Sequence, residues 1–262
     1  EFAPGDRVCY RANQIECTRD GDDVSPVRGT HCSRAVVDAD ESVVEHHPAD
    51  ASPASTSLFA LASIGLNGVQ MADVRETDVV VVQGAGLVGL AVVAWAVERG
   101  ATVVAVDPVV ERLSVAESLG ATEVVAPQAS DVERCVSTVA PEGADVVFEA
   151  TGRESLVDAG MVLCAAGGRF VFMSDYGDAD VSFGFRTAHT KELTAVFPCG
   201  DGGADCRRRA LDGIANGDVG WGDVVETVLD PADAPAFYDR LLDDDASVGL
   251  GATVRWPDHY GS

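Results

Sequence analysis

Three glycines, Gly84, Gly86 and Gly89, stand between two apolar runs in the stretch VVVVQGAGLVGLAV. At this spacing, glycines let a chain turn tightly after a strand, approach a dinucleotide pyrophosphate, and bring the next helix close to that strand. The free N–H groups and positive dipole end of that helix then bind the two phosphates. The alternative is a tight corner in a packed core that binds nothing.

Asp107 favours the binding interpretation. It ends the next predicted strand, 23 residues after Gly84, where a carboxylate can accept hydrogen bonds from both ribose hydroxyls of an adenosine. A 2′-phosphate would meet a like charge there, so we predict NAD as the cofactor, with NADP disfavoured. Arg112 either softens this preference or is an ordinary solvated helix residue. The chain has no P-loop motif, which argues against a nucleoside triphosphatase.

The elements that must position these residues alternate along the chain. From Val79 to Phe197, short aliphatic runs typical of buried parallel strands are separated by segments of helical periodicity. We expect strands over 79–82, 102–106, 123–125, 145–148, 169–173 and 193–197, and helices over 87–98, 110–119, 130–139 and 156–164. This order predicts an α/β fold with a doubly wound parallel Rossmann sheet.

The flanks predict a smaller, incomplete β-rich unit. Strand-like pieces at 35–38 and 42–45 precede a helix over 55–68, and a strand, a helix and a last strand are expected over 224–229, 233–242 and 252–256. We therefore predict a partial substrate domain over 1–68, a dinucleotide-binding domain over 69–217, and a segment over 218–262 that returns to the substrate domain. The start at Glu1 predicts either a partial chain or a naturally short one.

Charge limits the partners of the chain. The 43 acidic residues exceed the 18 basic ones and give a formal net charge of −25. No basic stripe is available for a phosphate backbone, so nucleic acid is not an expected partner. Dispersed carboxylates and a single lysine, Lys191, predict a halophilic protein. Molar salt shortens the Debye length to about 3 Å and so screens the repulsion among the carboxylates. The alternative is an acidic protein from ordinary salt.

Apolar segments and cysteines indicate the compartment. No apolar run approaches the ~18 residues of a membrane span, and no signal peptide is recognisable, so no membrane partner is expected. The seven cysteines contain no CxxC pair and fit a reducing cytoplasm. Of these, Cys9, Cys17 and Cys32, together with His31, match no standard metal-ligand spacing.

Further stretches are similar to the medium-chain dehydrogenase/reductase superfamily. They are DVVFEATG, AAGGRFVFMS, KELTAVF, FAPGDRVCY, HCSRAVVDADESVV and DPADAPAFYDRLL. The turn GAGLVG resembles the alcohol, polyol and threonine dehydrogenase branches. The resemblance implies a GroES-like substrate domain, hydride transfer between nicotinamide and an alcohol or carbonyl substrate, and a homodimer or homotetramer.

The resemblance also implies where the cofactor lies. It assigns the pyrophosphate to the glycine turn and the helix start, the adenosine ribose to the end of the second strand, and the nicotinamide ribose to the EATG segment. The carboxamide is expected near the backbone that follows the last two strands. In chain order, these residues are Gly84, Gly86, Leu87, Val88, Gly89, Asp107, Arg112, Thr151, Gly152, Phe172, Met173, Val196 and Pro198.

The zinc ligands of the relatives are not matched. The early cysteine and the Gly-His-Glu motif of zinc-dependent members belong to a segment expected before Glu1, and the third ligand position falls near Ala60. We therefore predict no metal site and identify no catalytic residue. His46 and His47 are expected in a surface loop. His189 is either a proton donor or a structural residue.

Two other functions stay open. A dinucleotide-binding redox sensor or scaffold without dehydrogenase activity would explain the unmatched zinc ligands. A zinc-independent reductase of alkenes or quinones is disfavoured by the GAGLVG turn, because those relatives usually carry a double glycine inside it.

Overall fold

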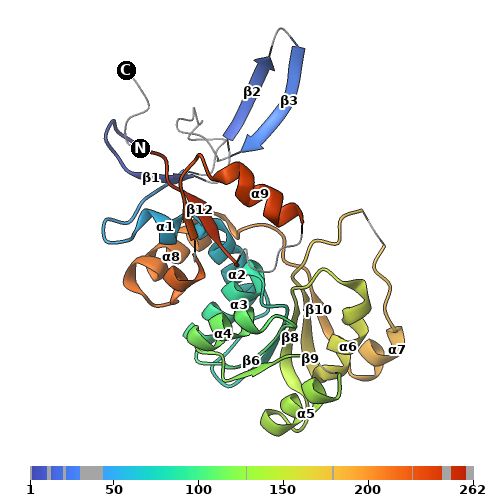
Figure 1. The fold of residues 1–262 in the computed structure, drawn as a ribbon. Coiled ribbons are helices and arrows are strands. Elements are labelled where there is room, and N and C mark those ends of the chain that lie inside the picture. Colours follow the sequence, from blue (N-terminus) through green and yellow to red (C-terminus); the bar gives the residue numbers. More distant parts are fainter. Residues whose placement is uncertain are drawn as a thin grey trace.

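The computed structural model describes residues 2–10, 44–127, 129–178, 180–225, 227–243 and 249–257, and the backbone of 13–19 and 22–29. Six parallel strands form one sheet in the order β10-β9-β8-β5-β6-β7 (Figure 1). In chain order they are β5 (Val79–Gln83), β6 (Thr102–Val106), β7 (Glu123–Val125), β8 (Ala144–Glu149), β9 (Cys164–Phe172) and β10 (Thr194–Val196). This is the predicted Rossmann sheet, and the α/β fold class is confirmed.

Helices cover both faces of the sheet, which is why its strands are apolar without alternation. One face packs against α2 (Phe59–Met71), α3 (Leu87–Glu98) and α4 (Val110–Ser118). The other packs against α5 (Ala129–Val139) and α6 (Val157–Leu163). Alternate residues of β5 divide between the two cores: Val80 and Val82 belong to the first, and Val81 to the second.

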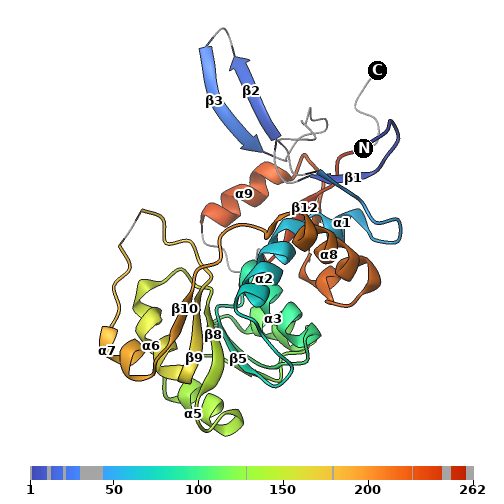
Figure 2. The ribbon, with the colours of Figure 1, turned by 180° about the vertical axis from the view of Figure 1, so that it is seen from behind.

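Helix α3 is buried on every side, as its apolar sequence predicts. All its residues from Gly89 to Ala96 are buried, because α2 and α8 (Gly203–Asn216) cover the side that faces away from the sheet (Figure 2). The indole Nε1 of Trp95 donates a 2.8 Å hydrogen bond to the Ala62 carbonyl on α2. Helix α8 was not predicted from the sequence, because three consecutive arginines interrupt its apolar residues.

Smaller elements gather beyond the start of α2 (Figure 1). The strands pair two by two: β1 (Val8–Tyr10) with β4 (Val44–His46), β2 (Asn13–Arg19) with β3 (Asp22–Gly29), and β11 (Thr227–Leu229) with β12 (Ala252–Val254). The helices are α1 (Pro53–Thr56) and α9 (Ala234–Leu242). On the sheet side of the molecule, α7 (Phe185–Thr190) leads into β10.

Several predicted boundaries were wrong for local reasons. The helix expected over 55–68 is divided into α1 and α2. Val224 belongs to a 3-10 turn, Trp221–Val224, and only Thr227–Leu229 of that predicted strand is extended. Cys164 ends α6 and begins β9, with an extended backbone. The piece at 35–38 lies outside the described residues, and the proposed domain boundaries stay predictions.

Across the part of the chain that the structure describes, helices long and apolar enough to cross a membrane are absent.

Candidate functional site

The glycine turn occupies the carboxyl end of β5, and two of its glycines have no room for a side chain. Gly84 has a φ of +96°, and a Cβ there would lie 2.8 Å from the Ala150 carbonyl oxygen. A Cβ on Gly89 would lie only 1.8 Å from the Gly84 carbonyl oxygen. These two glycines therefore allow the turn itself and the close packing of α3 against it.

Gly86 differs from its neighbours because its Cβ position is open. No described atom lies within 4 Å of that position, and the backbone φ of −73° suits any residue. Gly86 is the N-cap of α3, and no described side chain caps the first turn of this helix. The first N–H groups of a helix have no acceptor inside it. Open space beside free donors fits the pyrophosphate of a dinucleotide.

The sheet topology places this turn at a switch point. After β7 the chain crosses over to β8, on the other side of β5, so the connections diverge between β5 and β8. Ligands of doubly wound sheets bind in the crevice that forms there, outside the carboxyl ends of the strands.

Asp107, after β6, is held more tightly than expected. Its side chain is 4% exposed, and its oxygens accept hydrogen bonds of 2.8 Å from the backbone N–H groups of Ala85 and Val109. The guanidinium of Arg112, 43% exposed, lies 3.7 Å from Oδ2. Asp107 therefore braces the glycine turn. Because each carboxylate oxygen can accept a second hydrogen bond, the predicted ribose contact stays a prediction.

Thr151 and Gly152 follow β8, on the opposite side of the switch point. Thr151 donates from its backbone N–H, at 2.8 Å, and from its hydroxyl to one carboxylate oxygen of Glu149. The Gly152 N–H donates to Ser174 Oγ at 2.8 Å. Sequence reasoning missed Glu149, although a carboxylate at the end of the strand ADVVFE, directly after its apolar residues, was a visible signal.

Tyr176 holds the other oxygen of the same carboxylate. Its hydroxyl donates a hydrogen bond to Glu149 Oε2. Burial, followed by the hydrogen bond and the charge of Glu149, raises the pKa of Tyr176 well above its usual range. The phenol therefore keeps its proton at neutral pH and remains the hydrogen-bond donor to Glu149.

The residues predicted near the carboxamide lie at the ends of the two neighbouring strands. Phe172 and Met173 end β9 and are buried, whereas Val196 ends β10 and Pro198 follows it. The ring of Phe197 stacks on Phe172, with centroids 4.7 Å apart and planes 6° apart. The structure therefore brings the predicted cofactor residues to one edge of the sheet. Whether they bind a cofactor stays a prediction.

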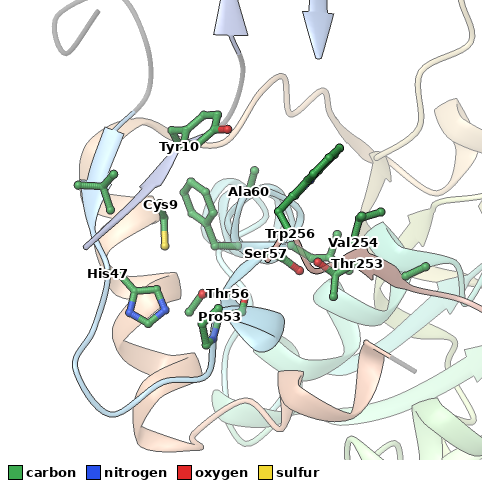
Figure 3. A pocket seen from close by; sticks show the side chains of 14 residues that line it. Cys9, Tyr10, His47, Pro53, Thr56, Ser57, Ala60, Thr253, Val254 and Trp256 are labelled. Carbon is green, nitrogen blue, oxygen red and sulfur yellow. Dashed lines mark hydrogen bonds between the residues drawn. The ribbon is translucent and has the colours of Figure 1, made fainter. Parts of the chain in front are cut away.

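A separate cavity of about 330 Å³ lies between β1, α1, the start of α2 and β12 (Figure 3). The side chains of Cys9, His47 and Thr56 are on its wall, and Ala60 lies nearby on α2. Both ring nitrogens of His47 are buried and have no hydrogen-bond partner among the described residues. His47 lies in the loop after β4, as predicted, and is half-buried, with its ring on the wall of the cavity.

The described side chains do not form a metal site. They contain no group of three or more His, Cys, Asp or Glu residues that could hold a metal ion. Ala60 has no ligand atom, and the side chains of Cys17, His31 and Cys32 lie outside the described residues. The described cysteines are all free thiols: Cys9, Cys135, Cys164, Cys199 and Cys206.

His189 lies at the wrong edge of the sheet for a proton donor. It belongs to α7, which precedes β10, so it is near the amino ends of the parallel strands. Its ring stacks on Phe185, with centroids 5.1 Å apart. The next turn is fixed by Lys191, whose Nζ donates to the Val162 carbonyl at 2.6 Å. The structural alternative fits His189, and the proton-donor alternative does not.

Comparison with known proteins finds a family model that matches part of the chain. Residues 88–214 match the family model described as zinc-binding dehydrogenase. This stretch is therefore similar to zinc-binding dehydrogenases. The matched stretch begins inside the first turn of α3, after Gly84 and Gly86, and it contains Asp107, Glu149 and the ends of β6, β8, β9 and β10. The name of this family mentions zinc, but the described residues contain no group of three or more His, Cys, Asp or Glu side chains that could hold a metal ion.

Proteins similar to this chain include alcohol and polyol dehydrogenases. D-xylulose reductase of Saccharomyces cerevisiae is 34% identical over 56% of this chain and 43% of its own length. The alcohol dehydrogenase TADH from Thermus sp. ATN1 is 26% identical, with a TM-score of 0.69 over 82% of this chain and 61% of that one. A dehydrogenase-family structure from Sinorhizobium meliloti 1021, bound to NADP, is 25% identical, with a TM-score of 0.71 over 80% and 62%.

The chain spans only part of these proteins. It covers 38%, 59% and 43% of the lengths of three curated relatives that it matches. Their names therefore describe proteins with more chain than is present here.

Proposed function

We propose that this chain belongs to an NAD-dependent oxidoreductase that transfers hydride between nicotinamide and an alcohol or carbonyl carbon. The observation that carries the proposal is the open space at Gly86, beside the uncapped first turn of α3. A tight corner needs Gly84 and Gly89, but it gives no reason for a third glycine with empty space at its Cβ. A pyrophosphate in that space gives one.

Each side of the switch point would hold one half of the cofactor. The glycine turn and the α3 amides would bind the pyrophosphate, and Asp107 would accept from the adenosine ribose. Thr151 and Gly152 would line the nicotinamide ribose, with Val196 and Pro198 near the carboxamide. Bound NAD would supply the hydride acceptor, and the protein would orient it and exclude water.

Preference for NAD over NADP rests on the buried carboxylate of Asp107. A 2′-phosphate near it would add like charge, and the guanidinium of Arg112, which lies 3.7 Å from Asp107 Oδ2, is 43% exposed, so solvent weakens its compensation. The opposite expectation, a preference for NADP, is supported by the similar structure from Sinorhizobium meliloti 1021, which is bound to NADP. The ratio of kcat/KM for the two cofactors in high salt measures the preference, and a strong NADP preference would refute the role given to Asp107.

The proposed substrate class is a polyol or the matching ketone. It is supported by the similarity to D-xylulose reductase and by the GAGLVG turn. The described residues show no metal-ligand group, so we assign no step to zinc and name no proton donor.

NADH titration followed by turnover assays tests the proposal. NADH fluorescence should report saturable binding, and oxidation of polyols with NAD, with and without added zinc, should report turnover. Binding without turnover of alcohols, polyols, amino-alcohols or enones would support the sensor or scaffold instead. Reduction of an enone would support the alkene reductase. A cytoplasmic location and a homodimer or homotetramer remain proposals from the family resemblance.

A further inference from the structure

Glu149 is a completely buried carboxylate without an ion-pair partner among the described residues. Its exposed fraction is 0%, and it ends β8 at the switch point. Burying a charge is costly unless hydrogen bonds replace the lost water. Three donors do so here: the Thr151 N–H at 2.8 Å, the Thr151 hydroxyl and the Tyr176 hydroxyl. Because burial of the Glu149 carboxylate is costly and its hydrogen bonds are made, we expect it to fix the position of the segments that donate to it.

The carboxylate joins two segments that are separate in the chain. Through Thr151 it fixes the turn after β8, and through Tyr176 it fixes the segment after β9. The Glu149 carbonyl strengthens the link by accepting from the Met173 N–H at 2.9 Å. The turn also meets the glycine turn, because Thr151 Cγ2 lies 2.9 Å from where a Cβ on Gly84 would be.

The adenosine side of the crevice is braced by other groups. There, Asp107 accepts from the N–H groups of Ala85 and Val109. The Glu149 contacts and the Asp107 contacts share no residue, although the two turns touch at Gly84 and Thr151, so either carboxylate can be changed without removing a hydrogen bond of the other.

We infer that Glu149, together with Tyr176, is a positioning pair for the nicotinamide half of the cofactor. Glu149 acts through Thr151 and does not touch the cofactor. The inference rests on the proposed function, and it goes beyond it by dividing the site into two independently braced halves. All three contacts point donors at the carboxylate, so an amide at this position would replace one acceptor with an NH2 group, and the Tyr176 hydroxyl would have to turn and accept in place of donating.

The test compares NADH with ADP as ligands of the full chain. ADP probes the adenosine half alone, whereas NADH probes both halves. We expect Glu149→Gln to raise the Kd for NADH about tenfold and Tyr176→Phe to raise it about threefold, with the Kd for ADP within twofold of wild type in both. Glu154→Gln is the matched control, because Glu154 is an exposed neighbouring carboxylate that accepts from Ser182. Its NADH affinity should equal that of wild type.

The outcomes separate this inference from the proposed function. If neither ADP nor NADH shows saturable binding to the wild-type chain, the proposed function and the positioning inference are both overturned. If wild type binds NADH, but the variants bind it equally well or lose ADP to the same extent, only the positioning inference is overturned. Should Glu149→Gln fail to fold, Tyr176→Phe decides the matter, since it removes one donor and leaves the carboxylate in place.

Discussion

Gly86 and Gly89 lie three residues apart in one turn, yet they tolerate a methyl group differently. At Gly86 the added carbon meets no described atom, whereas at Gly89 it meets the Gly84 carbonyl oxygen at 1.8 Å. The first position is open to a ligand, and the second is closed by the protein's own backbone. The common glycine pattern thus contains two positions that the fold requires and one open position, which we propose for binding.

We predict that Gly86→Ala changes the free energy of unfolding by less than about 0.5 kcal/mol and weakens NADH binding about tenfold. Gly89→Ala should lower the free energy of unfolding by at least about 2 kcal/mol, since a backbone oxygen cannot move aside cheaply. Urea unfolding and NADH titration of both variants measure this. Equal destabilisation by the two substitutions would contradict the assignment of Gly86 to the ligand.

Tyr176 makes a pH-dependent contribution to stability. Its pKa is raised in the folded protein by burial and by Glu149, whereas an unfolded tyrosine titrates near 10. The contribution is therefore complete below about pH 10 and is lost as the pH rises above it, because the unfolded chain loses the proton first. Urea unfolding at pH 8.5 and 10.5 should show a smaller loss in Tyr176→Phe than in wild type. Parallel losses would show that the Tyr176–Glu149 contact does not form.

Helix α8 depends on a close approach that only one residue type permits. A Cβ on Gly213 would lie 2.8 Å from Cη2 of the buried Trp95 on α3. The rest of the α8 contact face is apolar and belongs to the first core, through Cys206, Ala210 and Ile214. The packing of the outer helix on α3 is therefore set by one indole ring.

We predict that Gly213→Ala destabilises the protein by about 1–2 kcal/mol, despite the better helix propensity of alanine. Trp95→Phe alone should also destabilise it, because it leaves the Ala62 carbonyl without its donor. The double variant should lose less than the sum of the two, since phenylalanine leaves room for the new methyl group. Thermal or urea unfolding of all four proteins measures the coupling, and strict additivity would contradict the contact.

One ion-pair cluster connects the small N-terminal strands to the rest of the molecule. Arg207 on α8 contacts Glu45 of β4 at 2.9 Å and Asp201 at 3.2 Å, with 15% of its own side chain exposed. Both carboxylates are largely buried as well. Removing the arginine would leave two poorly solvated negative charges together in a chain that is already acidic.

We predict that Arg207→Ala lowers the free energy of unfolding by about 3 kcal/mol. Arg208→Ala is the matched control, because Arg208 pairs with Asp205 at exposed fractions of 61% and 96% and should contribute less than about 0.5 kcal/mol. Urea unfolding compares them. Similar values for the two variants would show that the Arg207 cluster does not join the two parts of the fold.

The net charge of −25 predicts a protein that needs salt. Multimolar KCl should raise the Tm by roughly 4–8 °C, corresponding to about 2 kcal/mol, since it screens repulsion among the carboxylates. Sucrose at equal osmolality is the control, because it stabilises proteins by exclusion but screens no charge. An unchanged Tm in KCl, or an equal rise in sucrose, would refute the halophile prediction.

Much of the fold was predictable, because its signals are local. The bounds of α3 and β6 match the expected ranges, because the pattern of apolar residues that predicts each element lies within a short run of consecutive residues. The three-glycine turn, its strand and its helix could be recognised for the same reason. Helix α8 was missed because its apolar stripe is narrow and is interrupted by Arg207, Arg208 and Arg209.

Local sequence therefore established the α/β class, the glycine turn and the acidic character of this protein, because each depends on composition or on residues within a few positions. Tertiary structure alone showed that Gly86 is open, that His47 faces a cavity and that Glu149 is buried against Tyr176. Glu149 and Tyr176 are 27 residues apart, and they meet because β8 and β9 pair in parallel. Such meetings depend on which strands become neighbours, and no short stretch of sequence contains that information.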